Sequence, residues 1–408
     1  MATIIAAQFQ SQDVRVTSSV HRFYAPELDL LRLFAFLIVF MRHVATGFGI
    51  AQKHTSETIH NSMTQYPGTY DSWALIQSLT QSLDFGVCLF FFLSSYLITS
   101  LLLIEKDATG HLDVRSFYVR RILRIWPLYF VFIVIMVLLG QYVSWLNITR
   151  YRVIASLLLV ANWPIVFHGW IGSPIEPLWS VSIEEQFYLL WPQLARHGRT
   201  VIVTISSILS IVPFMVITII GKFPNCTNPS LWTNSFVQCL FFSTGALTAA
   251  FLGQRIQRRR YSTRILLFIG GWSSWLCASS VCHVVRTSSP GVHYLLIGYA
   301  LITVGVIMIF MSFYGWRPAN LPPSLLYLGK ITYGLYVFHF FCLEISLRLL
   351  LDLTSHFKYS ISPMMIHAFS AVVALGLTIG CATLSYTFLE RPFLLLKKRF
   401  TVIPSRPT

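Results

Sequence analysis

The sequence comprises 408 residues, of which 55% are hydrophobic and only 11% are charged. Soluble globular proteins are about 25% charged, so this composition excludes a soluble protein and predicts an integral membrane protein. The net charge of +15 raises the question of nucleic-acid binding. However, the basic residues lie in short loops between apolar segments, where the positive-inside rule accounts for them. The seven cysteines show no metal-type pairing, and no phosphate-loop or dinucleotide motif occurs, so neither a metal nor a permanently bound cofactor is predicted.

Residues 1–27 are polar and lack the basic start and apolar core of a signal peptide, so they are interpreted as a cytoplasmic tail. Eleven apolar runs follow, each close to the roughly 20 residues that cross a membrane. They are 28–50, 83–104, 123–143, 151–168, 178–195, 200–221, 232–253, 263–285, 291–312, 324–351 and 363–390.

The basic loops decide between ten and eleven crossings. If 151–168 does not cross, the main clusters of Lys and Arg all face the cytoplasm, as the positive-inside rule requires. We therefore predict an all-α, polytopic transmembrane helix bundle of about ten spans with both termini cytoplasmic, and a re-entrant or interfacial 151–168. Eleven spans remain the alternative. The transmembrane domain is assigned to 28–394 and a basic cytoplasmic tail to 395–408.

Ionisable side chains inside a membrane are costly and mark candidate functional residues. Arg32 and His43 lie eleven residues apart in the first span and therefore share one helix face. Counting along each predicted helix puts His43, Glu184 and His339 all about 21–22 Å from the inner side of the membrane. The hypothesis that follows is one layer of three titratable groups from three helices.

Such a layer suits general-base chemistry. A histidine can take the proton of an attacking hydroxyl, and a nearby carboxylate can orient the imidazole, so His43 is predicted as the base and Glu184 as its partner. Tyr188, one turn from Glu184, is either a hydrogen-bond donor or an interfacial aromatic residue. Each intramembrane histidine also has a purely structural reading, as a hydrogen-bonding partner of a neighbouring helix.

A second cluster, Arg120, Arg121 and Arg124, begins the third span. Arg121 and Arg124 share a helix face. The cluster is either an anchor at the lipid headgroups or an anion site, because arginine forks bind phosphate groups such as those of coenzyme A.

Six segments in order resemble the acyltransferase 3 family, over residues 24–394. They are the Arg-x10-His pattern of Glu27 to His43, Phe90 to Ile98, Arg120 to Pro127, Trp179 to Tyr188, Gly329 to His339, and Ser385 to Phe393. Ser95 stands where the family usually has glycine, which puts a tight helix–helix approach there in doubt.

The resemblance implies a membrane-embedded O-acyltransferase that moves an acyl group, often acetyl, from acyl-CoA to a hydroxyl of a carbohydrate or glycosylated acceptor. Carried over by position, Arg32, His43 and Glu184 are the catalytic candidates. Arg120, Arg121 and Arg124 are the candidates for acyl-CoA binding, and His339, Tyr188, Ser182 and Trp179 are expected to support the site.

Other readings stay open at this stage. Intramembrane Arg, His and Glu also build proton relays, so a secondary transporter or flippase is the main alternative, and a sensor or assembly factor without chemistry is another. We expect membrane lipids, acyl-CoA and the acceptor as partners, with a separate envelope-biosynthesis protein completing the transfer if this chain does not do so alone. A bacterial inner membrane is the expected location.

Overall fold

The computed structural model describes residues 25–53, 69–223, 228–253, 259–284, 291–316, 321–356 and 362–401. Within these ranges the chain is helical and has no β-strand, as predicted. The main helices are α2 (Pro26–Lys53), α4 (Thr69–Ser82), α5 (Gly86–Thr109), α6 (Val114–Gly140), α7 (Arg150–Leu157), α8 (Asn162–His168), α9 (Leu178–Ala195), α10 (Arg199–Ile220), α11 (Asn228–Trp232), α12 (Ser235–Leu252), α13 (Tyr261–Ser280), α14 (Val292–Phe313), α15 (Pro323–Lys330), α16 (Thr332–His356), α17 (Pro363–Ser385) and α18 (Arg391–Lys397). The predicted N-terminal tail, up to residue 24, and the last residues of the basic tail lie outside the described residues.

Seven helical stretches in the described part of the chain are long and apolar enough to cross a membrane. They are Ile76–Thr109, Val114–Gly140, Arg199–Ile220, Ser235–Leu252, Val292–Phe313, Thr332–His356 and Met364–Phe400. The predicted spans 28–50, 178–195 and 263–285 are also helices (α2, α9 and α13) but are not among these seven. Charged side chains within α2 and α9 lower their apolar character, and the count of about ten spans stays a prediction.

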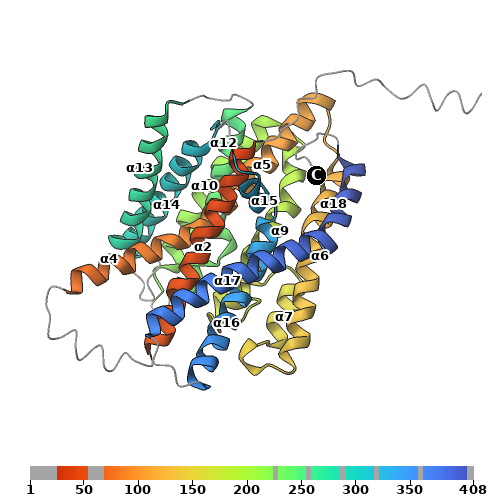
Figure 1. Cartoon of the computed structure of the whole chain (residues 1–408). Helices are drawn as coiled ribbons and strands as arrows, with labels where there is room; N and C mark the ends of the chain where they lie inside the picture. Colours follow the sequence, from red (N-terminus) through yellow and green to blue (C-terminus); the bar gives the residue numbers. More distant parts are fainter. Residues whose placement is uncertain are drawn as a thin grey trace, which may run out of the picture.

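The bundle has α5 in its interior. Figure 1 shows α13 and α14 on one side and α6, α7 and α18 on the other, with α2, α5 and α9 between them. Helix α5 packs closely against α12. A Cβ added at Gly245 would overlap the backbone of Phe92, so only glycine fits at this contact. The hydroxyl of Ser95 donates to the carbonyl of Phe242 in the same interface. Helices α5 and α12 therefore approach closely even though Ser95 replaces the glycine that the family usually has, because Gly245 on α12 provides the space.

The segment 151–168 is not one helix. It forms α7 and α8, separated by Leu159, whose φ of 58° lies in the left-handed region. At 1.5 Å per residue these helices are about 12 Å and about 10 Å long, well short of the roughly 30 Å apolar core of a bilayer. Neither piece is long enough to span a membrane by itself, and the re-entrant or interfacial position of 151–168 stays a prediction.

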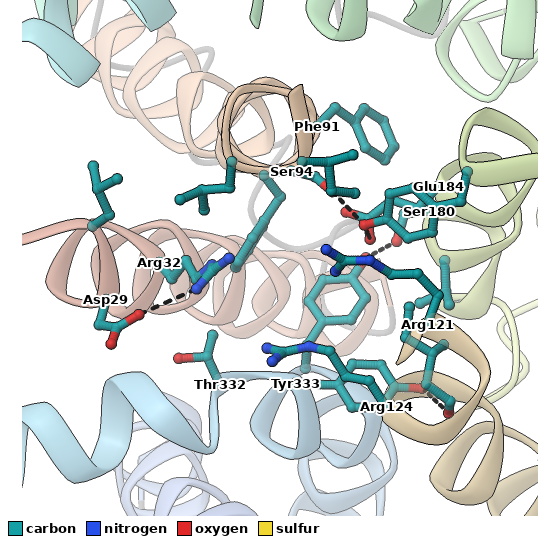
Figure 2. A pocket seen from close by; sticks show the side chains of 18 of the residues that line it. Asp29, Arg32, Phe91, Ser94, Arg121, Arg124, Ser180, Glu184, Thr332 and Tyr333 are labelled. Carbon is teal, nitrogen blue, oxygen red and sulfur yellow. Dashed lines mark hydrogen bonds and ion pairs between the residues drawn. The ribbon is translucent and has the colours of Figure 1, made fainter. Parts of the chain in front are cut away.

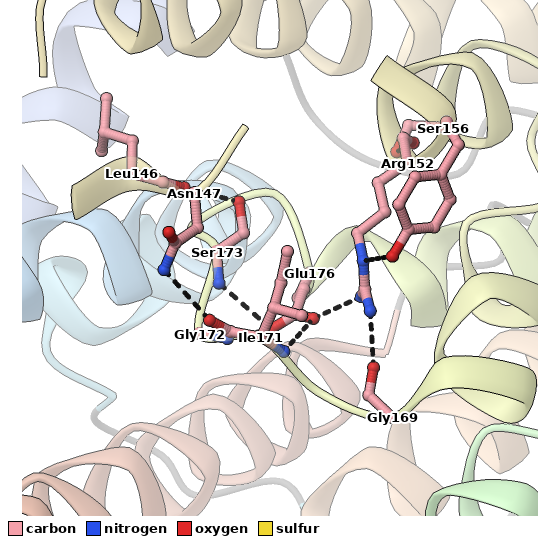
Figure 3. A network of polar contacts seen from close by, with 10 residues as sticks. Leu146, Asn147, Arg152, Ser156, Gly169, Ile171, Gly172, Ser173 and Glu176 are labelled. Atoms are coloured by element: carbon pink, nitrogen blue, oxygen red, sulfur yellow. Dashed lines mark hydrogen bonds and ion pairs between the residues drawn. The ribbon is translucent and has the colours of Figure 1, made fainter. Parts of the chain in front are cut away.

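The loop after α8 is held by a buried ion pair (Figure 3). Arg152 on α7 donates to the carboxylate of Glu176, which also accepts backbone N–H groups of Ile171, Gly172 and Ser173 at 2.9–3.1 Å. Arg152 is 3% exposed and Glu176 is 6% exposed. This network fixes the turn that leads directly into α9, and so it sets the position of the helix that carries Glu184 and Tyr188.

We expect the Arg152→Ala substitution to destabilise the fold by roughly 3–5 kcal/mol, because it leaves the carboxylate of Glu176 buried without its counter-charge. The measurement is the thermal unfolding temperature of the purified protein in detergent. Arg150→Ala is the matched control, since Arg150 is exposed at the start of the same helix. Equal unfolding temperatures for the two variants would show that the ion pair does not hold this loop.

The α5–α6 hairpin is closed by polar contacts near the end of α5 and the start of α6. The backbone N–H of Ser116 donates to Asp113 at 3.0 Å and its hydroxyl donates to the same carboxylate, capping α6. These hydrogen bonds hold the pKa of Asp113 below its ordinary value, so the stabilising cap is lost only as the pH falls through that lowered pKa. Glu105 accepts the backbone N–H of Asp113 and pairs with Arg120 at 3.0 Å, which ties the two helices together.

Candidate active site

A cavity of about 180 Å³ lies beside α5 and is lined by residues of α2, α5, α6, α9, α15, α16 and α18. On α5 its lining runs from Val87 to Leu101. The 14 steps from the first of these residues to the last cover about 21 Å at 1.5 Å per residue, so the cavity is elongated along the helix axis. It therefore suits a long ligand with different chemistry at its two ends.

Positive charge dominates the polar lining. Among the described residues, five cationic and two anionic side chains line the cavity, namely Arg32, Arg121, Arg124, Lys330 and Lys397 against Asp29 and Glu184. Figure 2 shows the guanidinium groups of Arg32, Arg121 and Arg124 directed into the same space. Arg32 pairs with Asp29 at 3.1 Å, one turn earlier in α2. The remaining excess of cations makes this part of the cavity a candidate anion site.

Arg121 is positioned by two aromatic rings. Its guanidinium lies 5.3 Å from the ring centroid of Phe117 and 5.4 Å from that of Tyr188, both within cation–π range. The hydroxyl of Tyr188 donates to Glu184 at 2.9 Å and also contacts the hydroxyl of Ser94. The Nε atom of Arg121 is buried without a hydrogen-bond partner in the described structure. A buried unpaired donor of this kind fits a site whose ligand supplies the acceptor.

The other end of the cavity is aromatic. The ring of Tyr336 on α16 lies 5.7 Å from that of Phe90 on α5, and both line the cavity. The Tyr336 hydroxyl is hydrogen-bonded to Ser180 at 2.7 Å and donates to the carbonyl of Pro177 at 3.3 Å. The cavity thus changes from cationic to mainly apolar along its length.

Two histidines lie just beyond this end. The rings of His43 on α2 and His339 on α16 are 5.2 Å apart, and the ring of Tyr336 lies 5.3 Å from that of His339. His339 is fully buried, and its Nδ1 donates to the backbone carbonyl of Tyr336 at 2.5 Å. Because a carbonyl only accepts, Nδ1 carries the proton and Nε2 is left as an acceptor, for which the described structure shows no partner.

The predicted layer of three groups is therefore only partly formed. The rings of His43 and His339 lie side by side, whereas the role of Glu184 in orienting His43 stays a prediction. In the described part of the chain, the hydrogen bond of Glu184 goes to Tyr188, and Glu184 lines the cavity that also contains Arg32 and Arg121. The carboxylate of Glu184 thus faces the cavity that the arginines line.

Three further predicted residues do not line the cavity. Arg120 is engaged by Glu105 and by the carbonyl of Phe400, so only Arg121 and Arg124 of its cluster reach the cavity. Ser182 contacts the hydroxyl of Tyr129 at 3.3 Å and accepts the backbone N–H of Ala161, which joins α9 to the break after α7. Trp179 is buried between rings, with those of Phe91 and Trp170 within 6.3 Å. Ser182 and Trp179 support the helix that carries the site.

Sequence reasoning missed several lining residues. Lys397 was assigned to the cytoplasmic tail, yet α18 returns to the bundle and places it in the cavity beside the arginines. Two features of the sequence indicate a helix docked on the bundle at this point. They are the proline at the second position of α18 and the apolar run 393–396. Ser94, Ser180 and Tyr336 had no signal of their own, because hydroxyl residues are common in membrane helices.

Comparison with known proteins now decides the family. A family model described as an acyltransferase domain, of the acyltransferase 3 type, matches residues 26–386, which include the histidine pair and most of the cavity lining but not Lys397. The chain belongs to the acyltransferase 3 family. No solved structure matches the chain at a significant level.

Three curated bacterial relatives share parts of the sequence. The peptidoglycan O-acetyltransferase OatA of Listeria monocytogenes is 40% identical over 116 residues, 26% of this chain and 19% of the relative. The putative peptidoglycan O-acetyltransferase YrhL of Bacillus subtilis is 27% identical over 363 residues, 79% of this chain and 53% of the relative. A putative O-acetyltransferase of Staphylococcus aureus strain COL is 27% identical over 335 residues, 76% of this chain and 52% of the relative. The chain thus spans about half the length of the last two relatives and less of the first.

Proposed function

We propose that this protein is a membrane O-acyltransferase that transfers an acetyl group from acetyl-CoA to a hydroxyl of a peptidoglycan-type polysaccharide. The observation that carries the proposal is the elongated cavity, which is cationic at one end and aromatic at the other, with the histidine pair directly behind its aromatic end. Family membership and the names of the relatives support the same activity.

The spacing of the two ends favours coenzyme A as the carrier. Arg32 and His43 lie on one face of α2, about 16 Å apart along the helix axis. An acyl-CoA has its phosphates at one end and its thioester at the other, joined by a long flexible arm. In this proposal Arg121, Arg124 and Lys397 bind the phosphates, and the thioester extends towards the histidines.

The transfer itself needs one proton acceptor. His43 takes the proton of the acceptor hydroxyl while the hydroxyl oxygen attacks the thioester carbonyl. The carbon–sulfur bond then breaks, the thiolate recovers the proton from the His43 imidazolium, and the products are the ester and free coenzyme A. His339, with Nδ1 bonded to a backbone carbonyl, supports the adjacent imidazole. No nucleophilic serine or cysteine is required, because the site holds donor and acceptor together.

The acceptor class comes from the relatives' names, and their bacterial origin supports a bacterial inner membrane as the location. We propose a separate envelope-biosynthesis protein as a partner if this domain does not complete the transfer to the acceptor alone.

The test uses the full chain purified in nanodiscs. Thiol release from acetyl-CoA is followed with and without soluble peptidoglycan fragments, and transfer of radiolabelled acetyl to the glycan is counted. Acceptor-dependent thiol release with labelled glycan supports the proposal. If no acyl-CoA is consumed by the folded protein with any envelope glycan offered, the proposal fails, and the secondary transporter becomes the function to examine.

A further inference from the structure

Tyr336 is the cavity-lining residue that contacts the histidine pair. Its side chain lines the cavity, and its ring lies 5.3 Å from that of His339, whereas neither His339 nor His43 is among the lining residues of the described structure. The same ring lies 5.7 Å from Phe90, which lines the cavity from α5. Tyr336 therefore lies at the end of the cavity nearest His339, whose ring is beside that of His43.

The ring of Tyr336 is held firmly. Its hydroxyl is hydrogen-bonded to Ser180 at 2.7 Å and to the carbonyl of Pro177 at 3.3 Å, both at the start of α9. Tyr336 is only 8% exposed and Ser180 6% exposed, so water competes little for these bonds. Both of these buried hydrogen bonds must break before the ring can swing away.

Resting on the proposed function, we propose that Tyr336 determines the length of the acyl group that this protein accepts. A thioester that enters from the cationic end meets Tyr336 and Phe90 at the far end of the cavity. An acetyl group ends after one methyl and fits in front of the ring. Each further methylene must enter the volume that the ring occupies, so longer acyl groups are rejected by overlap.

The expected discrimination is large enough to measure. One methylene more or less in an apolar pocket changes specificity roughly 10- to 200-fold. Removing the ring gives an acyl chain room in the direction of His339, which lies directly behind it. The effect is therefore on the ratio between long and short donors and not on the overall binding of coenzyme A, whose charged end lies among the arginines.

The experiment compares kcat/KM for acetyl-, butyryl- and hexanoyl-CoA in wild type, Tyr336→Ala and Tyr336→Phe, all as full-length protein in nanodiscs with the same glycan. For Tyr336→Ala the ratio of hexanoyl to acetyl transfer is expected to rise at least tenfold. Tyr336→Phe keeps the ring and loses only the hydroxyl, so it is expected to retain the wild-type order of donors. Phe90→Ala, which enlarges the same end from α5, is expected to raise the ratio in the same direction.

The experiment distinguishes failure of the Tyr336 assignment from failure of the proposed acyltransferase function. Wild-type transfer of acetyl with an unchanged donor ratio in folded Tyr336→Ala and Phe90→Ala overturns the assignment of Tyr336 and leaves the acyltransferase intact. Should Tyr336→Ala fail to fold, as judged by thermal unfolding, Phe90→Ala decides by itself. Absence of transfer from every donor by folded wild type counts against the proposed function, and with it against this assignment.

Discussion

Replacing His43 by alanine is expected to lower kcat for acetyl transfer roughly 100- to 10,000-fold, the range that general-base catalysis contributes. The reason is that His43 carries one of the two imidazoles that meet behind the cavity, and no other histidine of the described chain has its ring beside that of His339. The measurement is thiol release from acetyl-CoA in the presence of glycan, with binding of coenzyme A measured separately by calorimetry.

Binding of coenzyme A should change little in this variant, because the cationic end lies about 16 Å away along α2. His111→Ala is the matched control, since His111 is exposed in the loop between α5 and α6. If His43→Ala folds normally and keeps the wild-type rate, the base lies elsewhere and the proton route through the histidine pair must be abandoned.

Replacing Arg121 by alanine is expected to raise KM for acetyl-CoA roughly 10- to 100-fold, equivalent to about 1.5–3 kcal/mol for a charge-assisted hydrogen bond. The physical reason is the position of its guanidinium, which Phe117 and Tyr188 hold at the cavity with Nε unpaired. Since this contact exists in both ground state and transition state, kcat should fall much less than kcat/KM.

Two further variants of α6 sharpen this experiment. Arg121→Lys keeps the charge but not the planar fork, and so is expected to lie between wild type and Arg121→Ala. Arg115→Ala removes an exposed arginine from the first turn of the same helix and should leave KM at the wild-type value. An unchanged KM in Arg121→Ala would remove this arginine from the donor site.

Some of the site was accessible from residue types and spacing alone. Arg32 and His43 are separated by three helical turns, so their common face follows from helix geometry. The pairing of Arg121 with Arg124 on one face follows in the same way. By contrast, Lys397 was placed in a tail, because its neighbours Lys398 and Arg399 make a charge cluster typical of a cytoplasmic end.

The sequence by itself determined the all-α membrane fold, the family, and which ionisable residues lie within apolar helices, because apolar runs and helical periodicity are local properties. Only the tertiary structure decided which of these residues meet. It brings His43 to His339, turns Glu184 towards Tyr188 and the arginines, and places the ring of Tyr336 beside that of His339. Periodicity gives the direction of a side chain about its own helix axis, whereas the rotation and neighbours of each helix depend on packing between residues far apart in the chain.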